Sequence, residues 1–435
     1  GVTWAPAADD TWTVSGSFAR YVSSLATAVA ENSPAGNAAT YQFAYQGPAI
    51  NADPNGALLT SPQAIRQVFD WFNANGGSNR PFLSASIPGV NVFINDSLKS
   101  PYSYEYSTGV ARTIGGRGTF RFDYVFRDYN DFYAQRTDLT TGRATSPVGV
   151  TFDIGLIENN PDLKRRYQGG TFQMTYRLGS QTTLGGNYTL SRLWGNIDGE
   201  NAASGPLTSR LTDFPEYREA RWNLPEGNLA GDQRHRLRLY GTYRVPMAPT
   251  AGSLDLSLMY STASGVPYGL NGATASAPGL TVGQIDPREY VTNPGYANPL
   301  SSTATVEYFF FARDRFRTET QHRTDLSINY RHGLVGRSEA FFRGEVLNIF
   351  NQFQLCACGG TVFTNGGGSD MRSINTGVQT RASAGATSGL VAFNPFTVDP
   401  IEGTHWRLAP NFGAPATRFA YTSPRLFRFS VGVRF

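Results

Sequence analysis

Hydrophobic and polar residues alternate along many segments of this chain, with the two-residue period that is typical of β-strands. At the C-terminus one parity holds Phe427, Phe429, Val431, Val433 and Phe435. The same alternation recurs at 119–127, 171–177, 183–191, 234–245, 254–260 and 325–331, with fainter copies at 13–21, 103–112 and 338–349. We therefore predict an all-β chain with about eleven or twelve antiparallel strands.

Strand length and the polar parity separate a membrane barrel from a soluble sandwich. Several segments exceed the five or six residues that are usual in sandwich strands. Their polar positions carry Thr, Ser, Asn, Gln, Gly and Arg, whereas a soluble surface is usually rich in Lys and Glu. Charged residues make up 16% of the chain and aromatic residues 13%. These features favour a transmembrane antiparallel β-barrel over a soluble sandwich.

The connections between the segments come in two sizes. Short turns near 178–180 and 246–252 alternate with long polar excursions at 22–100, 137–165, 195–231, 262–304 and 351–424. Short turns on one side and long loops on the other are typical of outer-membrane barrels. We therefore predict a barrel domain over 1–435, in contact with outer-membrane lipid in the bacterial outer membrane, with the long loops extracellular.

The first long loop, 22–100, contains a helix signal near 61–75. Ser61 as N-cap and Pro62 at the first helical position would open it, and the glycines at 76–77 would end it. Ile65, Val68, Phe69 and Phe72 would then share one face. We expect a packed loop helix there, not a membrane anchor.

Several other classes of protein are disfavoured. No apolar run reaches the roughly 18 residues that a transmembrane helix needs. The formal charge of +4 is too small to indicate a nucleic-acid partner. The four histidines lie far apart, and neither a nucleophile elbow nor a phosphate-binding glycine loop occurs in strand-helix context. We expect no enzymatic activity, no metal and no cofactor.

The two cysteines of the chain, Cys356 and Cys358, form a C-x-C sequence in the last long loop, 351–424. In an oxidising setting at the cell surface, each is the other's one intramolecular option for a disulfide, which would close a very small, strained ring. We favour this loop-tip disulfide. A soft-metal site or an intermolecular bond stays open as an alternative.

The polar parity of the strands carries many charged residues that we predict to face the lumen. One reading is a cationic path that attracts anionic substrates; the other, which we favour, is pairing with acids on neighbouring strands and on a plug. Three like charges at 234, 236 and 238 are costly unless acids or a plug surface oppose them. The candidate lumen-facing residues are Arg121, Asp123, Arg127, Arg177, Arg234, Arg236, Arg238, Arg244, Asp325, Arg331, Arg343, Glu345, Arg428 and Arg434.

Two stretches resemble a known family. The last strand, 425–435, looks like the C-terminal signal that the outer-membrane assembly machinery recognises, with Phe435 last and apolar residues at alternating positions before it. The stretch 342–351 resembles the E-x-x-N-x-F-N signature of TonB-dependent receptors through Glu345, Asn348, Phe350 and Asn351. The sequences of the strand starts at 232–237 and 323–328 are most similar to those of the Oar-like branch.

This resemblance implies a 22-stranded barrel with an N-terminal plug, which imports scarce ligands using energy from the TonB complex. The chain would supply about half of those strands, and neither a plug nor a TonB box is recognisable in it. We therefore expect the C-terminal half of such a barrel, with the N-terminal half and plug on the same or a separate chain. A small self-closed barrel is the alternative architecture. A barrel anchor in a cell-surface or secretion assembly is the alternative function, and a passive porin is less favoured.

Overall fold

The computed structural model describes most of the chain. The described residues are 1–6, 11–23, 38–53, 56–80, 82, 84–87, 89–145, 149–197, 215–217, 226–229, 231–268, 271–274, 294–297, 306–309, 312, 314–334, 336–356, 374–375, 378–392, 400–415 and 418–435. Within them, no helix is long and apolar enough to cross a membrane.

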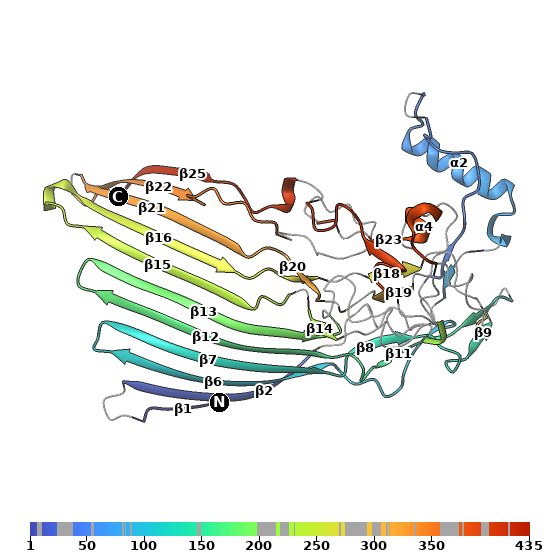
Figure 1. Ribbon diagram of the computed structural model, residues 1–435, viewed down its shortest axis with the longest axis horizontal. Helices are drawn as coiled ribbons and strands as arrows, with labels where there is room; N and C mark the ends of the chain where they lie inside the picture. Colours follow the sequence, from blue (N-terminus) through green and yellow to red (C-terminus); the bar gives the residue numbers. More distant parts are fainter. Residues whose placement is uncertain are drawn as a thin grey trace.

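One large antiparallel sheet of 12 strands dominates the structure (Figure 1). Its strands lie side by side almost in chain order, so neighbours are joined by hairpins, and β14 pairs with β13. The strands are β1 (Val2–Trp4), β2 (Trp12–Val22), β6 (Tyr102–Ile114), β7 (Gly118–Asn130), β12 (Arg165–Leu178), β13 (Thr182–Gly195), β14 (Gly227–Asn228), β15 (His235–Val245), β16 (Ser253–Ala263), β21 (Gln321–Gly333), β22 (Glu339–Leu347) and β25 (Leu426–Arg434). The predicted all-β fold is confirmed, and each alternating segment coincides with one of these strands.

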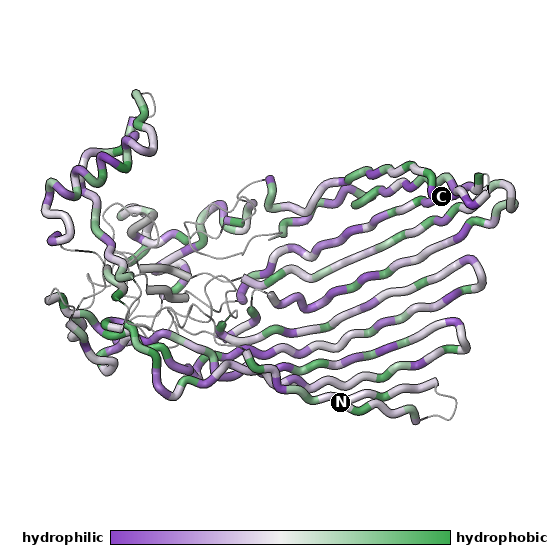
Figure 2. Tube along the Cα trace, turned by 180° about the vertical axis from the view of Figure 1, so that it is seen from behind, coloured by the Kyte–Doolittle hydropathy of each residue, from purple (hydrophilic) through white to green (hydrophobic). Residues whose placement is uncertain are grey.

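The pairing register keeps the two parities on opposite faces across the sheet. Because the side-chain period of a strand is two, a slip of one residue would exchange the faces. Figure 2 shows the alternation of hydrophilic and hydrophobic positions along the strands. One cross-strand row of the apolar face, which we call the outward face, holds Val14, Val110, Phe122, Phe172, Tyr188 and Leu237. One row of the polar face, which we call the lumen face, holds Arg121, Gln173, Asn187, Arg238, Ser261 and Arg323.

Short and long connections lie at opposite ends of the sheet (Figure 1). The short turns are 115–117, 179–181, 246–252 and 334–338, and we call their side the turn end. The long connections lie at the loop end. They carry the smaller sheets, formed by β3 (Thr40–Gln42) with β4 (Ser84–Ser86); β5 (Val92–Ile94), β8 (Tyr133–Arg136) and β11 (Gly155–Asn159); β9 (Arg143–Thr145) with β10 (Thr151–Asp153); β17 (Pro267–Tyr268) with β20 (Phe316–Arg317); β18 (Asn271–Thr274) with β19 (Val306–Phe309); and β23 (Val378–Thr380) with β24 (Trp406–Leu408).

The hydrophobic core of the described residues lies at the loop end. Tyr133 and Ile157 are buried between β8 and β11 with Val92, Ile94 and Leu98 packed against them. A second cluster unites Phe132, Ala134, Leu163 and Ile197. By contrast, large outward side chains of the main sheet are exposed, with Phe429 at 69% and Val431 at 77%. The long strands thus form a wall whose apolar face requires an apolar medium, while the loops fold around a core of their own.

The helix α2 (Ser61–Ala74) projects from the loop end (Figure 1). Its N-cap is Thr60, one residue before the predicted Ser61, and the Thr60 N–H donates to the Gln63 side-chain oxygen at 2.9 Å. The expected single packed face is wrong in part. Phe72 packs on Phe43, with ring centroids 5.0 Å apart, but Ile65 and Phe69 are exposed at 58% and 60%. The other helices that the structure describes are short, namely α4 (Arg381–Ala384) and the 3₁₀ turns Gly77–Asn79, Pro215–Tyr217, Pro249–Ala251, Ala386–Ser388 and Arg418–Ala420.

Candidate functional site in the lumen wall

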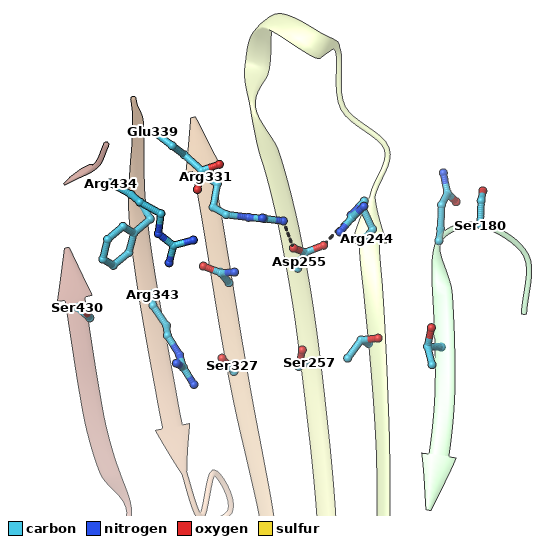
Figure 3. A pocket seen from close by; sticks show the side chains of 15 residues that line it. Ser180, Arg244, Asp255, Ser257, Ser327, Arg331, Glu339, Arg343, Ser430 and Arg434 are labelled. Atoms are coloured by element: carbon cyan, nitrogen blue, oxygen red, sulfur yellow. Dashed lines mark hydrogen bonds and ion pairs between the residues drawn. The ribbon is translucent and has the colours of Figure 1, made fainter. Parts of the chain in front are cut away.

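A polar cavity of about 640 Å³ lies on the lumen face at the turn end, across β13, β15, β16, β21, β22 and β25 (Figure 3). Because the lumen parity of these strands is hydrophilic, the cavity has charged walls and small hydroxyl residues between them. Its lining residues are Ser180, Gln181, Thr183, Thr242, Arg244, Asp255, Ser257, Ser327, Asn329, Arg331, Glu339, Phe341, Arg343, Ser430 and Arg434.

A single carboxylate links three adjacent strands in this cavity. Asp255 on β16 accepts a hydrogen bond from Arg244 Nε on β15 at 2.9 Å and another from Arg331 Nη2 on β21 at 2.9 Å. Figure 3 shows both arginines reaching the same carboxylate from opposite sides. Charge-assisted bonds of this kind are stronger than neutral ones. Asp255 therefore balances charge on both neighbouring strands and fixes the two side chains against the wall.

The other two arginines of the cavity have different surroundings. Arg343 donates to Glu345 on the same strand at 2.5 Å. Arg434 lies in register with Glu339, and its guanidinium carbon is 6.0 Å from the centre of the Phe341 ring. Most charges in the wall of this cavity are paired. Such a surface can hold a polar segment or pass a polar solute.

The predicted lumen-facing residues are distributed along the whole wall. Arg331, Arg343 and Arg434 meet in the cavity of Figure 3, together with Arg244. Arg236 and Arg238 line a second cavity nearer the loop end. Arg177 and Arg428 lie on the lumen parity outside both cavities. The remaining predicted residues form separate ion pairs: Arg121 with Asp123 (2.6 Å), Arg127 with Glu105, Arg234 with Asp232 (3.5 Å), Asp325 with Arg323 (2.7 Å), and Glu345 with Arg343.

Sequence reasoning overlooked several acids that complete these pairs. Asp255 lies on the polar parity of its segment, which was the available signal, but its partners depend on the strand register. Asp232 is almost fully buried; it accepts the Leu193 N–H at 2.8 Å and an Arg317 N–H at 2.5 Å. The predicted Cys356–Cys358 bond stays a prediction, because Cys358 lies outside the described residues; Cys356 is fully buried and disulfide-bonded.

Two of the described histidines lie close to tyrosine hydroxyl groups. His235 lies on the outward parity, where its Nδ1 is 2.8 Å from the Tyr188 hydroxyl oxygen. Tyr260 and His322 form a similar pair at 2.9 Å. In the part of the chain that the structure describes, no group of three or more His, Cys, Asp or Glu side chains could hold a metal ion.

Comparison with known proteins identifies the family. The sequence matches the family described as "Outer membrane beta barrel domain" over residues 1–386. The chain belongs to this family. An outer-membrane barrel domain accounts for the exposed apolar face, and the protein resides in the bacterial outer membrane. No curated protein matches the sequence.

Several solved structures match parts of this chain at low identity. The outer membrane transporter YddB from Escherichia coli is 11% identical with a TM-score of 0.41, and the match covers 81% of this chain and 36% of that one. The FrpB iron transporter from Neisseria meningitidis is 11% identical with a TM-score of 0.34, over 81% and 34% of the two chains. The siderophore receptor PirA from Acinetobacter baumannii is 15% identical with a TM-score of 0.31, over 60% and 29%. The matches thus span about a third of these proteins.

Proposed function

We propose that this chain is the C-terminal part of the barrel of a TonB-dependent receptor of the Oar-like branch, and that it takes part in ligand uptake across the outer membrane. The observation that carries the proposal is the pair of open edges of the main sheet. In the described part of the chain the strand order begins at β1 and ends at β25, and these two strands do not pair.

Open edges have a large energetic consequence in a membrane. Each backbone N–H or C=O left without a partner in hydrocarbon costs several kcal/mol, so spanning sheets close into barrels. β25 presents exposed apolar residues along its whole length, and among the described strands it pairs with β22 alone. A partner sheet that supplies the remaining strands would satisfy both edges. The small self-closed barrel considered above would instead require β25 to pair with β1 or β2.

Site-specific photo-crosslinking tests this architecture. A photo-reactive residue at Ser430, on the edge strand β25, should capture a polypeptide segment outside residues 1–435, on the same or another chain. The matched control is Tyr240 on β15, which also faces the lumen but lies between two strands of this chain. It should therefore give no crosslink to a barrel strand outside residues 1–435. Crosslinks from Ser430 to β1 or β2 alone would refute the half-barrel proposal.

A lumen position tests the uptake role. With the photo-reactive residue at Ser257, which lines the cavity of Figure 3, a plug segment should be captured, and loss of the chain should reduce energy-dependent uptake of a scarce solute. The TonB complex and the assembly machinery enter the proposal through the family resemblance. We place the turn end in the periplasm and the loop end outside the cell, because outer-membrane barrels have short periplasmic turns.

A barrel anchor in a cell-surface assembly is the second candidate, favoured by one observation. Ile65 and Phe69 lie one helical turn apart on α2 and are exposed, beyond the loop-end sheets. Exposed apolar side chains on a projecting helix suit contact with another protein. A Ser430 crosslink to further barrel strands combined with no capture from Ser257 would favour the anchor over uptake.

A further inference from the structure

A second cavity on the lumen face has a different charge balance from the first. It has a volume of about 340 Å³ and lies near the loop end, where β15, β16 and β21 meet the base of the last loop. Arg236, Arg238 and Arg323 line it together with Ser261 and Gln321, and none of the lining residues that the structure describes is Asp or Glu. We call it the arginine pocket.

Two of the three arginines have no acidic partner among the described residues. Arg323 donates to Asp325 at 2.7 Å. Arg236 donates to the neutral side-chain oxygen of Gln233 at 2.7 Å. Arg238 makes no side-chain hydrogen bond or ion pair within the described part of the chain. By contrast, Arg244 at the other end of the same strand is bound to Asp255.

The strand geometry holds these charges close together. Arg236 and Arg238 are two residues apart on one face of β15, which places their Cα atoms roughly 6.6 Å apart. Arg238 is in register with Ser261, and Ser261 with Arg323, so two strand spacings of about 4.8 Å separate these arginines. Like charges on one sheet face repel each other. An anion placed between them would relieve that repulsion.

We propose that the arginine pocket binds a small solute that carries carboxylate or phosphate groups. Guanidinium groups donate in a planar fork that matches both kinds of oxyanion. The Ser261 hydroxyl and the Gln321 amide can bind uncharged polar atoms of the same solute. The volume is in the lower range of small-molecule sites. The inference rests on the proposed lumen of an uptake barrel and names the class of solute that the lumen would accept.

Binding to the purified full-length protein tests the inference directly. Isothermal titration in detergent would use citrate and inorganic phosphate as the anionic probes and glycerol as the uncharged probe. The test variant is Arg236→Gln/Arg238→Gln. The control variant, Arg177→Gln/Arg428→Gln, changes the net charge equally and removes two arginines of the same face outside both cavities. Faster gel mobility of unheated than of heated samples would verify that both variants are folded.

We expect the wild type to bind at least one anionic probe and not glycerol, with binding weakened about tenfold or more in the test variant and less than twofold in the control. Three results would overturn the inference: no binding of either anion, equal weakening in both variants, or binding only after a polypeptide segment is removed from the lumen. The Ser430 crosslink reports on the barrel architecture independently. Failure of anion binding alone would therefore leave the half-barrel proposal standing.

Discussion

Asn348 fastens the base of the last long loop, and its replacement tests how the C-terminal strand is held. Its side-chain nitrogen donates to the Gln352 carbonyl at 2.8 Å and to the Ser423 carbonyl at 3.0 Å, while its side-chain oxygen accepts the Gln352 N–H at 2.9 Å. The residue is 4% exposed and has φ = 54°. It therefore joins the end of β22 to the chain that enters β25, across a loop of more than 70 residues.

The expected cost of Asn348→Ala follows from these contacts. The variant loses three hydrogen bonds at about 1 kcal/mol each, and alanine in the left-handed region costs about 1 kcal/mol more. Together these terms should destabilise the Asn348 connection between β22 and β25, which we call the clamp, by about 4 kcal/mol. Asn348→Gly loses the same bonds but tolerates the backbone angle, so its cost should be about 1 kcal/mol smaller. The difference between the two variants isolates the backbone strain.

Amide hydrogen exchange of β25 measures this effect, because exchange reports local opening. In the full-length protein, Asn348→Ala should speed exchange of the β25 amides about 100-fold or more, while the β12 amides stay unchanged. Asn130→Ala is the control, since Asn130 makes one side-chain bond, to the Asp128 carbonyl at 3.2 Å. Unchanged exchange in β25 for Asn348→Gly, or equal acceleration in β12, would refute the clamp.

Three further predictions concern other parts of the molecule. Burial raises the pKa of the Asp138 carboxyl, but hydrogen bonds from Thr140 and the Arg136 guanidinium outweigh burial and leave the pKa below its ordinary value. The loop-end sheet that contains Arg136 should therefore lose stability as the pH falls below about 4 and through that lowered pKa. In a protease-sensitivity assay, Asp138→Asn should make this loss of stability less dependent on pH. Gly252→Ala should destabilise the β15–β16 turn by about 2 kcal/mol or more in denaturant unfolding, because φ is 84° and a Cβ would lie 2.2 Å from the Arg331 carbonyl oxygen. The control Gly333→Ala should be nearly neutral, because a Cβ there would meet open space. Deleting Phe435, which is 94% exposed at the end of the apolar parity, should lower the assembled amount in pulse-labelling without changing synthesis; unchanged surface levels would contradict a role in assembly.

The wall was predictable from the sequence because its determinants are local. Alternation at 254–260 alone places Leu258 on the outward face and Ser257 on the lumen face, and β16 follows this pattern there except at Met259, an apolar residue on the lumen parity. The pairing of charges was not predictable in the same way. Asp255 bonds to residues 11 positions before it and 76 positions after it, and no local pattern encodes that register. The structure of the loop end was the least predictable from the sequence, because its core joins short segments such as β5 and β11 that lack a sustained hydrophobic period.

The same residue type therefore serves two purposes on one face of the sheet, and the register decides which. Arg244 and Arg331 flank Asp255 and are bound to it, so they stiffen the turn end of the wall. Arg238 shares the parity and strand of Arg244, yet its cross-strand neighbours are Asn187 and Ser261, which carry no charge. An arginine that only supported the wall would gain from an acid at either of those positions. Arg238 instead lies beside a hydroxyl and an amide, which leave its charge unbalanced among the described residues. This imbalance is why we propose that an anionic group of a solute binds there.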